Sequence, residues 1–213
     1  MMKMKTTQSI PLSFLLLSTN LLLGIANSVS HDVAVLDTNG KEVRPGDNYY
    51  IVPAERGKGG GVTLSNYCPY HVIQTLNEPT NGLPLKFSPV NRHERVVQLN
   101  TDINIKFIDF HGSKCKESKV WKFDANKQIP DGNYFVTTGG VEGQTGSQSL
   151  PNWFKIQKFE DAYKLEYCPS ANLCNGPCVD QTIVCRDIGS VLHNGQRRLA
   201  VQPPALKVKF KKA

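Results

Sequence analysis

The sequence lacks the short motifs that identify the common enzyme classes. It has no Gly-x-Ser-x-Gly segment for a nucleophilic serine, no pair of histidines at metal-ligand spacing, and no glycine-rich phosphate loop between a strand and a helix. The run Gly59-Gly60-Gly61 follows no strand–helix unit, and we interpret it as a flexible hairpin tip. We therefore expect a protein that is not an enzyme and that uses neither a cofactor nor a metal ion.

Helical periodicity is also missing. Short apolar or alternating runs recur along the chain, and almost all of them are followed by Gly, Pro, Asn or Asp. About a dozen strands at this spacing predict an all-β fold, either a barrel or a sandwich. In one clear example, the side chains of Ile103, Ile105 and Phe107 should face the core. Asn104 and Lys106 should then point outward.

The N-terminal segment has the order of a cleaved secretory signal. Lys3 and Lys5 precede an apolar stretch from Leu12 to Ile25, and small residues follow up to Ser30. An anchor helix is the alternative, but the stretch is shorter than the ~20 apolar residues that a membrane span needs. We expect residues 1–30 to be a signal peptide and residues 31–213 to be one domain, secreted to the extracellular space or sent to the vacuole.

The chain beyond this leader has no further run that could span a membrane, and it is mildly basic. Of the 25 Lys and Arg residues two lie in the leader, which leaves 23 against 18 Asp and Glu residues, a formal charge of +5. This balance suits solubility and does not by itself indicate a nucleic-acid partner. The alternating Lys207, Lys209 and Lys211 could form a heparin or nucleic-acid patch, but a solvated strand face is the simpler interpretation.

Six cysteines follow the leader: Cys68, Cys115, Cys168, Cys174, Cys178 and Cys185. In an oxidising compartment they predict three disulfides, although six cysteines allow 15 pairings. A zinc site built from the last four is the alternative, but they lack the paired Cys-x-x-Cys spacing that such sites use.

The segment after the leader carries a spaced signature. Val35, Asp37, Gly40 and Val43 are followed by Tyr49-x-Ile51, with the turn dipeptides Asn39-Gly40 and Pro45-Gly46 between two apolar runs. This spacing resembles the opening of the plant Kunitz-type (soybean trypsin inhibitor-like) family. The resemblance extends over the whole chain beyond the leader through four further landmarks, which are Cys68-Pro69, Ser88-Pro89, Trp153-Phe154-Lys155-Ile156 and Asn194-Gly195-Gln196-Arg197-Arg198-Leu199.

The resemblance implies a fold and a set of bridges. The fold is a disulfide-stapled β-trefoil, a six-stranded barrel closed by a cap of hairpins. The implied disulfides are Cys68–Cys115, Cys168–Cys185 and Cys174–Cys178.

The resemblance also implies a function, that of a secreted, monomeric, substrate-like inhibitor of serine endopeptidases. A cysteine protease is the alternative partner, and neither nucleic acid nor membrane is expected as one. Two other functions stay open on the same scaffold. One is a non-inhibitory storage or defence protein. The other is a glycosidase-like protein, for which Asp109, Glu160 and Asp161 could supply carboxylates, although the sequence does not place two of them at a catalytic separation.

In the resembled family the protease-contact loop follows Ser-Pro-x, which here gives Ser88, Pro89, Val90, Asn91, Arg92 and His93. Alignment without gaps puts Asn91 at the primary position, and we expect Arg92, one residue later, to enter the acidic pocket of a trypsin-like enzyme. Family inhibitors brace this loop with an asparagine whose aligned position is Pro45. Proline has no side-chain donor, so the bracing must come from elsewhere.

A second candidate contact loop precedes the inner cysteine ring. It consists of Ala171, Asn172 and Leu173, and we expect Leu173 to be exposed and to fill a pocket. The alternative is that the bridges only staple a long loop with little core beneath it.

Overall fold

The computed structural model describes residues 33–109, 112–128, 134–174, 185–201 and 204–213. The chain divides into two units, Met1–His31 and Asp32–Ala213. The predicted signal peptide and Cys178 lie outside the described residues. Among the residues that are described, no helix is long and apolar enough to cross a membrane.

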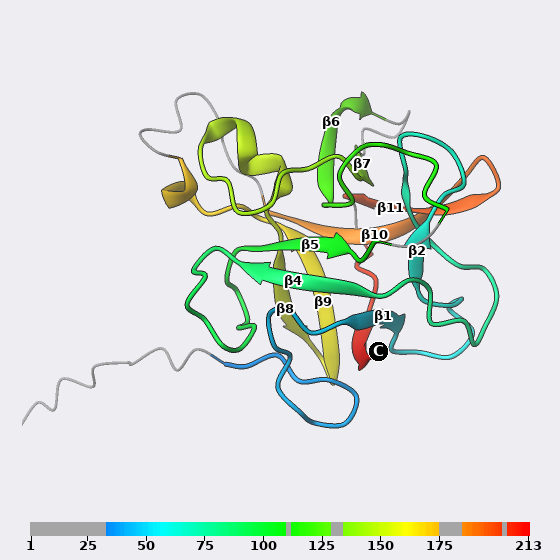
Figure 1. Cartoon of the computed structure of the whole chain (residues 1–213). Coiled ribbons are helices and arrows are strands. Elements are labelled where there is room, and N and C mark those ends of the chain that lie inside the picture. Colours follow the sequence, from blue (N-terminus) through cyan, green and yellow to red (C-terminus); the bar gives the residue numbers. More distant parts are fainter. Residues whose placement is uncertain (1–32, 110–111, 129–133, 175–184, 202–203) are drawn as a thin grey trace, which may run out of the picture. The chain divides into compact units, whose positions relative to one another are not determined.

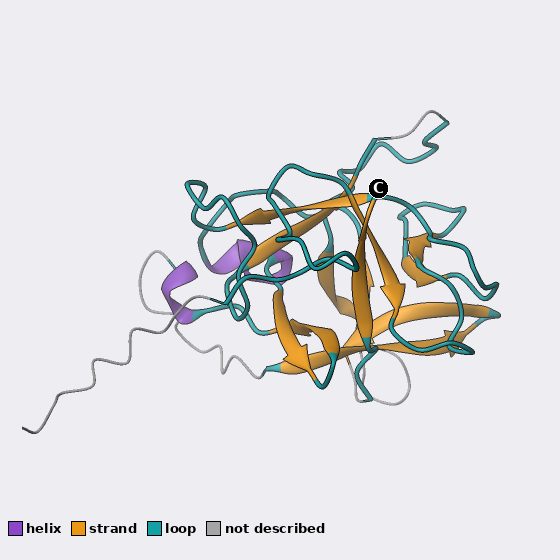
Figure 2. Ribbon diagram, turned by 90° about the horizontal axis from the view of Figure 1, so that it is seen from below, coloured by secondary structure: helices purple, strands orange, loops and turns teal. Residues whose placement is uncertain are grey.

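Twelve antiparallel strands and two short 3-10 turns make up the described part of the second unit (Figure 1). The strands are β1 (Tyr49–Pro53), β2 (Val62–Leu64), β3 (Val72–Gln74), β4 (Leu85–Pro89), β5 (Ile103–Phe107), β6 (Lys122–Gln128), β7 (Tyr134–Thr137), β8 (Lys155–Phe159), β9 (Ala162–Tyr167), β10 (Arg186–His193), β11 (Gln196–Val201) and β12 (Val208–Lys212). The 3-10 turns η1 (Ser147–Asn152) and η2 (Ala171–Leu173) lie side by side (Figure 2).

Six of the strands form a closed barrel. β1 lies between β12 and β4, β4 pairs with β5, and β9 pairs with β8 and β12. The remaining gap, between β5 and β8, is closed by two backbone hydrogen bonds of 2.9 and 3.0 Å between Ile103 and Phe154. The order β1-β4-β5-β8-β9-β12 therefore returns to its start, and no barrel strand is left with an open edge.

The other six strands form three hairpins, β2–β3, β6–β7 and β10–β11. β11 pairs with β3 and with β7, and a bridge between His71 and Thr137 joins the remaining two hairpins. The strand order thus repeats three times as barrel strand, hairpin, barrel strand: β1 to β4, β5 to β8 and β9 to β12. This arrangement confirms the predicted β-trefoil, a six-stranded barrel with a hairpin cap.

Apolar side chains at alternate strand positions fill the barrel. Ile103, Ile105 and Phe107 of β5 are completely buried, as their alternation predicts. The buried rings of Phe87 and Phe210 meet edge-to-face with 5.3 Å between their centres. Burial of each large side chain stabilises the fold by about 1.5–3 kcal/mol. This packing fixes the register of β4 and β5 and therefore the point where the chain leaves β4.

Gly60 and Gly61 are buried, which corrects the interpretation of the glycine run as a flexible hairpin tip. The Gly61 N–H donates a 2.7 Å hydrogen bond to the carbonyl of Thr80. A Cβ on Gly61 would overlap the carbonyl oxygen of Asn81. The glycines are needed because two backbone segments approach too closely for a side chain.

Two disulfides join described residues, Cys68–Cys115 and Cys168–Cys185, with sequence separations of 47 and 17. Both are predicted pairings. Cys174 is also disulfide-bonded, and its predicted partner Cys178 lies outside the described residues. Three of the four cysteines considered for a zinc site, Cys168, Cys174 and Cys185, are therefore disulfide-bonded and are not the thiolates that such a site requires.

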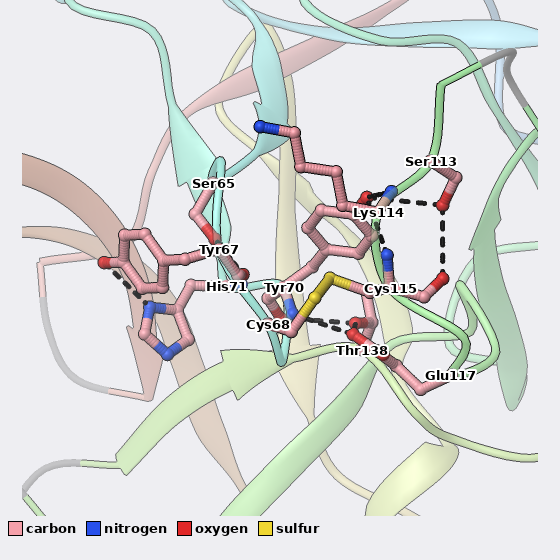
Figure 3. The surroundings of a disulfide bond; sticks show 10 residues. All are labelled: Ser65, Tyr67, Cys68, Tyr70, His71, Ser113, Lys114, Cys115, Glu117 and Thr138. Carbon is pink, nitrogen blue, oxygen red and sulfur yellow. Dashed lines mark hydrogen bonds between the residues drawn. A yellow bond between two sulfur atoms is a disulfide. The ribbon is translucent and has the colours of Figure 1, made fainter.

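Tyr70 anchors the chain next to the first bridge (Figure 3). Its hydroxyl oxygen accepts hydrogen bonds of 2.8 and 3.4 Å from the backbone N–H groups of Lys114 and Cys115, and it lies 3.2 Å from the Ser113 hydroxyl. The interaction with Ser113, followed by these backbone bonds, lowers the pKa of Tyr70 although burial opposes the shift. The tyrosine thus holds the Cys115 segment where the bridge forms.

Candidate functional site

The predicted contact loop begins inside a strand. Ser88 and Pro89 are the last two residues of β4, where they pair with Asn104 and Ile103 of β5. The Val90 N–H still donates a 2.9 Å hydrogen bond to the Asp102 carbonyl. The chain leaves the barrel only after this residue, so the barrel fixes the first half of the predicted loop directly.

The second half of the loop is a tight turn from Asn91 to Glu94. The Glu94 N–H donates to the Asn91 carbonyl at 3.1 Å, and the His93 N–H donates to the Asn91 side-chain oxygen at 3.2 Å. Asparagine favours such turns because its side chain can accept from the backbone two residues later. Asn91, Arg92 and His93 are all exposed. The turn therefore presents these three residues to solvent as a single projection.

A second segment lies against this loop and comes from the connection between β7 and η1. We call Val141–Gln144 the strap. The Glu142 carboxylate accepts hydrogen bonds from the Ser88 hydroxyl at 2.5 Å and from the Lys106 ammonium at 3.2 Å. The Gly143 carbonyl accepts a 3.3 Å bond from Nη2 of Arg92. The strap thus touches the loop at its strand end and at its turn.

Asn104 fixes the strap to the barrel. Its side-chain nitrogen donates to the Asn152 carbonyl at 2.8 Å, and its side-chain oxygen accepts from the Gly143 N–H at 2.6 Å. The indole of Trp153 donates to the Gln144 carbonyl at 3.0 Å. Asn104 is completely buried. The side chain points out of the barrel, as its alternation predicts, but it does not reach solvent because the strap and η1 cover it.

The charge of Glu142 is set by the same contacts. Burial disfavours the carboxylate, but the hydrogen bonds from Ser88 and Lys106 and the nearby ammonium of Lys86 outweigh it and lower the pKa of Glu142. The group is therefore an anion at neutral pH. A charged acceptor makes stronger hydrogen bonds than a neutral one, so the strap is held electrostatically as well as by Asn104.

Pro45 lies next to the loop, in a groove that it shares with the strap. With Gly46, Lys86, Arg92 and Glu142 it lines a groove of about 440 Å³. Because its ring offers no donor or acceptor, it can contribute only packing at the position where the resembled family has asparagine. The polar contacts described above come instead from Glu142 and Gly143 of the strap, which line the same groove.

The second candidate loop differs from its prediction. Ala171 and Asn172 are exposed, but Leu173 is only 2 % exposed, so the expected exposure of Leu173 is wrong. Leu173 packs in a small cluster with Leu150 and Trp153. The carbonyl of Leu173 also accepts a 2.6 Å hydrogen bond from Gly146. The segment therefore packs against η1, and Leu173 is buried in this contact.

Each of the three carboxylates considered for a glycosidase forms an ion pair with a lysine. Asp109 lies 3.3 Å from the Lys119 ammonium. Glu160 and Asp161 each lie 2.6 Å from the Lys207 ammonium. Asp109 thus pairs with a different lysine from the other two, and each of the three carboxylates forms an ion pair within the protein.

The sequence and the fold both match known proteins. Residues 35–212 match the Kunitz legume family, described as trypsin and protease inhibitor. The chain is 42 % identical over 184 residues to Kunitz trypsin inhibitor 5 of Arabidopsis thaliana, with 84 % of this chain and 85 % of that protein covered. It is 37 % identical to miraculin of Synsepalum dulcificum, with 98 % of each covered.

Among solved structures, it resembles a Kunitz-type cysteine protease inhibitor from potato. The TM-score is 0.72 and the identity 30 %, over 85 % of this chain and 98 % of that one. The extent of the family match and of these alignments shows that the chain belongs to the Kunitz legume family of trypsin and protease inhibitors.

Proposed function

We propose that this protein is a substrate-like inhibitor of trypsin-like serine endopeptidases and that Ser88 to His93 make the main contact. Membership of the family supports an inhibitor role, with a protease as the partner. The observation that carries the finer proposal is the exposed Asn91-Arg92-His93 turn, which projects from a strand end that the barrel fixes. A loop that is already ordered loses little entropy when it enters a protease cleft.

Arg92 is the proposed anchor. Its guanidinium is exposed, and its bond to the Gly143 carbonyl is long, 3.3 Å. Exchange of this bond for a buried carboxylate in a protease pocket would be favourable because charge-assisted bidentate pairs are stronger than a bond to a neutral carbonyl. Asn91, by contrast, uses its side-chain oxygen within the turn.

Other functions have less support from the described residues. The potato relative is named as a cysteine protease inhibitor, which keeps a cysteine protease as the alternative target. The name of the relative miraculin mentions no protease, so a non-inhibitory protein is the second alternative. The lysine pairing of Asp109, Glu160 and Asp161 argues against a glycosidase and supports the proposal that the protein is not an enzyme. We further propose that it is secreted and acts as a monomer.

Titration of trypsin, chymotrypsin, subtilisin and papain with the purified domain tests the proposal. We expect stoichiometric inhibition of trypsin and weaker or no inhibition of papain. Inhibition of papain alone would replace the serine protease by a cysteine protease. Inhibition of none of the four would overturn the inhibitor function.

A further inference from the structure

The turn from Asn91 to Glu94 lies beyond the barrel pairing. β4 ends at Pro89, and the bond from the Val90 N–H to the Asp102 carbonyl is the last one described between this strand end and the segment that leads into β5. The returning chain is fixed again at Val97, whose N–H donates a 2.8 Å hydrogen bond to the Val43 carbonyl. The residues in between project from these two fixed ends. Their orientation therefore depends on contacts with the neighbouring strap.

The strap is rigid because it has several anchors on the body of the domain. Asn104 uses both its donor and its acceptor to hold the backbone at Gly143 and Asn152, and the Trp153 indole holds Gln144. Asn104 is shielded from water, and a shielded hydrogen bond is electrostatically stronger than an exposed one. Removal of the Asn104 side chain would leave two backbone groups without their partner.

The strap meets the Arg92 side chain at a glycine. Gly143 has a φ of +71°, a backbone conformation that favours glycine, and a Cβ on it would meet the end of the flexible Arg92 side chain, which would have to shift. Next to it, Glu142 spans from the Ser88 hydroxyl to the Lys106 ammonium, so one side chain connects the loop and the neighbouring strand.

We propose that the strap is the brace of the contact loop in this protein, and that Glu142 and Asn104 are its positioning residues. The brace takes the place of the N-terminal asparagine that Pro45 replaces, and Pro45, Glu142 and Gly143 line the same groove. Glu142 holds the strand end at Ser88, while Asn104 keeps Gly143 within reach of Arg92. The inference rests on the proposed function only for its consequence, which is that the braced loop resists release after cleavage.

Amide hydrogen exchange in the free protein tests the brace without any protease. The variants are Glu142→Ala and Glu142→Gln, with Asp161→Ala as the matched control because Asp161 is also a carboxylate paired with a lysine. We expect Glu142→Ala to raise exchange of the amides of residues 90–95 about tenfold. Glu142→Gln should recover part of the protection, and Asp161→Ala should leave it unchanged. Exchange in β9 and β12 serves as the internal measure of global stability.

Asn104→Ala is the second variant, and Ser88→Ala completes a double-mutant cycle with Glu142→Ala. If Glu142 acts through Ser88, the two changes together should cost no more protection than either alone. Unchanged exchange of residues 90–95 in Glu142→Ala, with Asp161→Ala also unchanged, would overturn the brace even if trypsin is inhibited. Increased exchange without inhibition of any protease would support the brace and overturn only the proposed function.

Discussion

Arg92 donates a 3.3 Å hydrogen bond to the carbonyl of Gly143, 51 residues further along the chain. The side chain proposed to enter a protease pocket is thus positioned by the protein's own backbone before it meets a partner. The guanidinium stays exposed, so it can exchange this carbonyl for a carboxylate. This relationship makes Arg92 the most informative residue to replace.

Arg92→Ala should weaken inhibition of a trypsin-like protease by at least about 2 kcal/mol, or roughly 30-fold, because a buried arginine anchor dominates such interfaces. Asn91→Ala should have a smaller effect. Leu173→Ala should reduce stability, because Leu173 is buried, and leave the inhibition constant of the folded protein unchanged. Inhibition constants for the three variants check this. A loss confined to Leu173→Ala would move the contact to the second loop.

The loop should loosen only in acid. The pKa of Glu142 is lowered from 4.5, so the carboxylate contributes stability that is complete above the unfolded-state pKa and is lost as the pH falls through the lower folded-state value. Exchange of residues 90–95, corrected for intrinsic rates, should be constant between about pH 7 and pH 5 and should rise below about pH 4.

Glu142→Gln is the control for this prediction, because its amide does not titrate. Lys86, Arg92 and Glu94 also line the groove, and Lys106 faces Glu142 from β5. A rise in exchange of the same size in Glu142→Gln would assign the acid response to another carboxylate, with Glu94 the next to test.

The bridge between Cys68 and Cys115 should be the more stabilising of the two described disulfides. It spans 47 residues, and on the chain-entropy model it should contribute about 4 kcal/mol, against about 3 kcal/mol for the 17-residue span of Cys168–Cys185. Denaturant unfolding of the two double alanine variants measures both values. Peptide mapping without reduction should also find Cys174 joined to Cys178, and a free thiol on either would contradict the third pairing.

Gly61→Ala should destabilise the domain by more than about 2 kcal/mol, because the new methyl group meets backbone at Asn81, which cannot rotate away. Gly195→Ala is the control. It has open space around it and a φ of +74°, so it should cost only the ~1 kcal/mol of a left-handed alanine. If thermal unfolding showed the same loss of stability for both variants, the backbone around Gly61 would have to shift at little cost, which contradicts the prediction.

The apolar alternation of Ile103, Ile105 and Phe107 predicted which side chains fill the barrel, because that information is local to the strand. It could not predict the burial of Asn104. The strap that covers this residue is 39 positions away in the chain, from Gly143 to Asn104. The only local signal was the amide side chain of Asn104 itself, in a strand whose other residues are apolar except for Lys106. A local pattern predicts which face of a strand a side chain lies on, whereas the burial of that face depends on loops that are distant in the sequence.

The predictions for Leu173 and for the glycine run at Gly61 were wrong for related reasons. Leu173 follows polar residues beside a cysteine ring, which favours a surface loop, yet η1 supplies Leu150 as an apolar partner. The glycine run indicated flexibility, but backbone from residues 80 and 81 packs against it. The barrel, the cap and the two described bridges were predictable from the family resemblance. The strap was not, because it acts through residues outside the aligned loop.

β12 lies between β1 and β9 in the barrel, so it closes the wall beside the first strand of the fold. During synthesis β1 emerges about 150 residues before β12, and the barrel cannot close until Val208 and the residues of β12 after it have been added. Until then the edge of β1 that β12 covers has no partner strand, so edge-to-edge misassociation competes with folding during that interval.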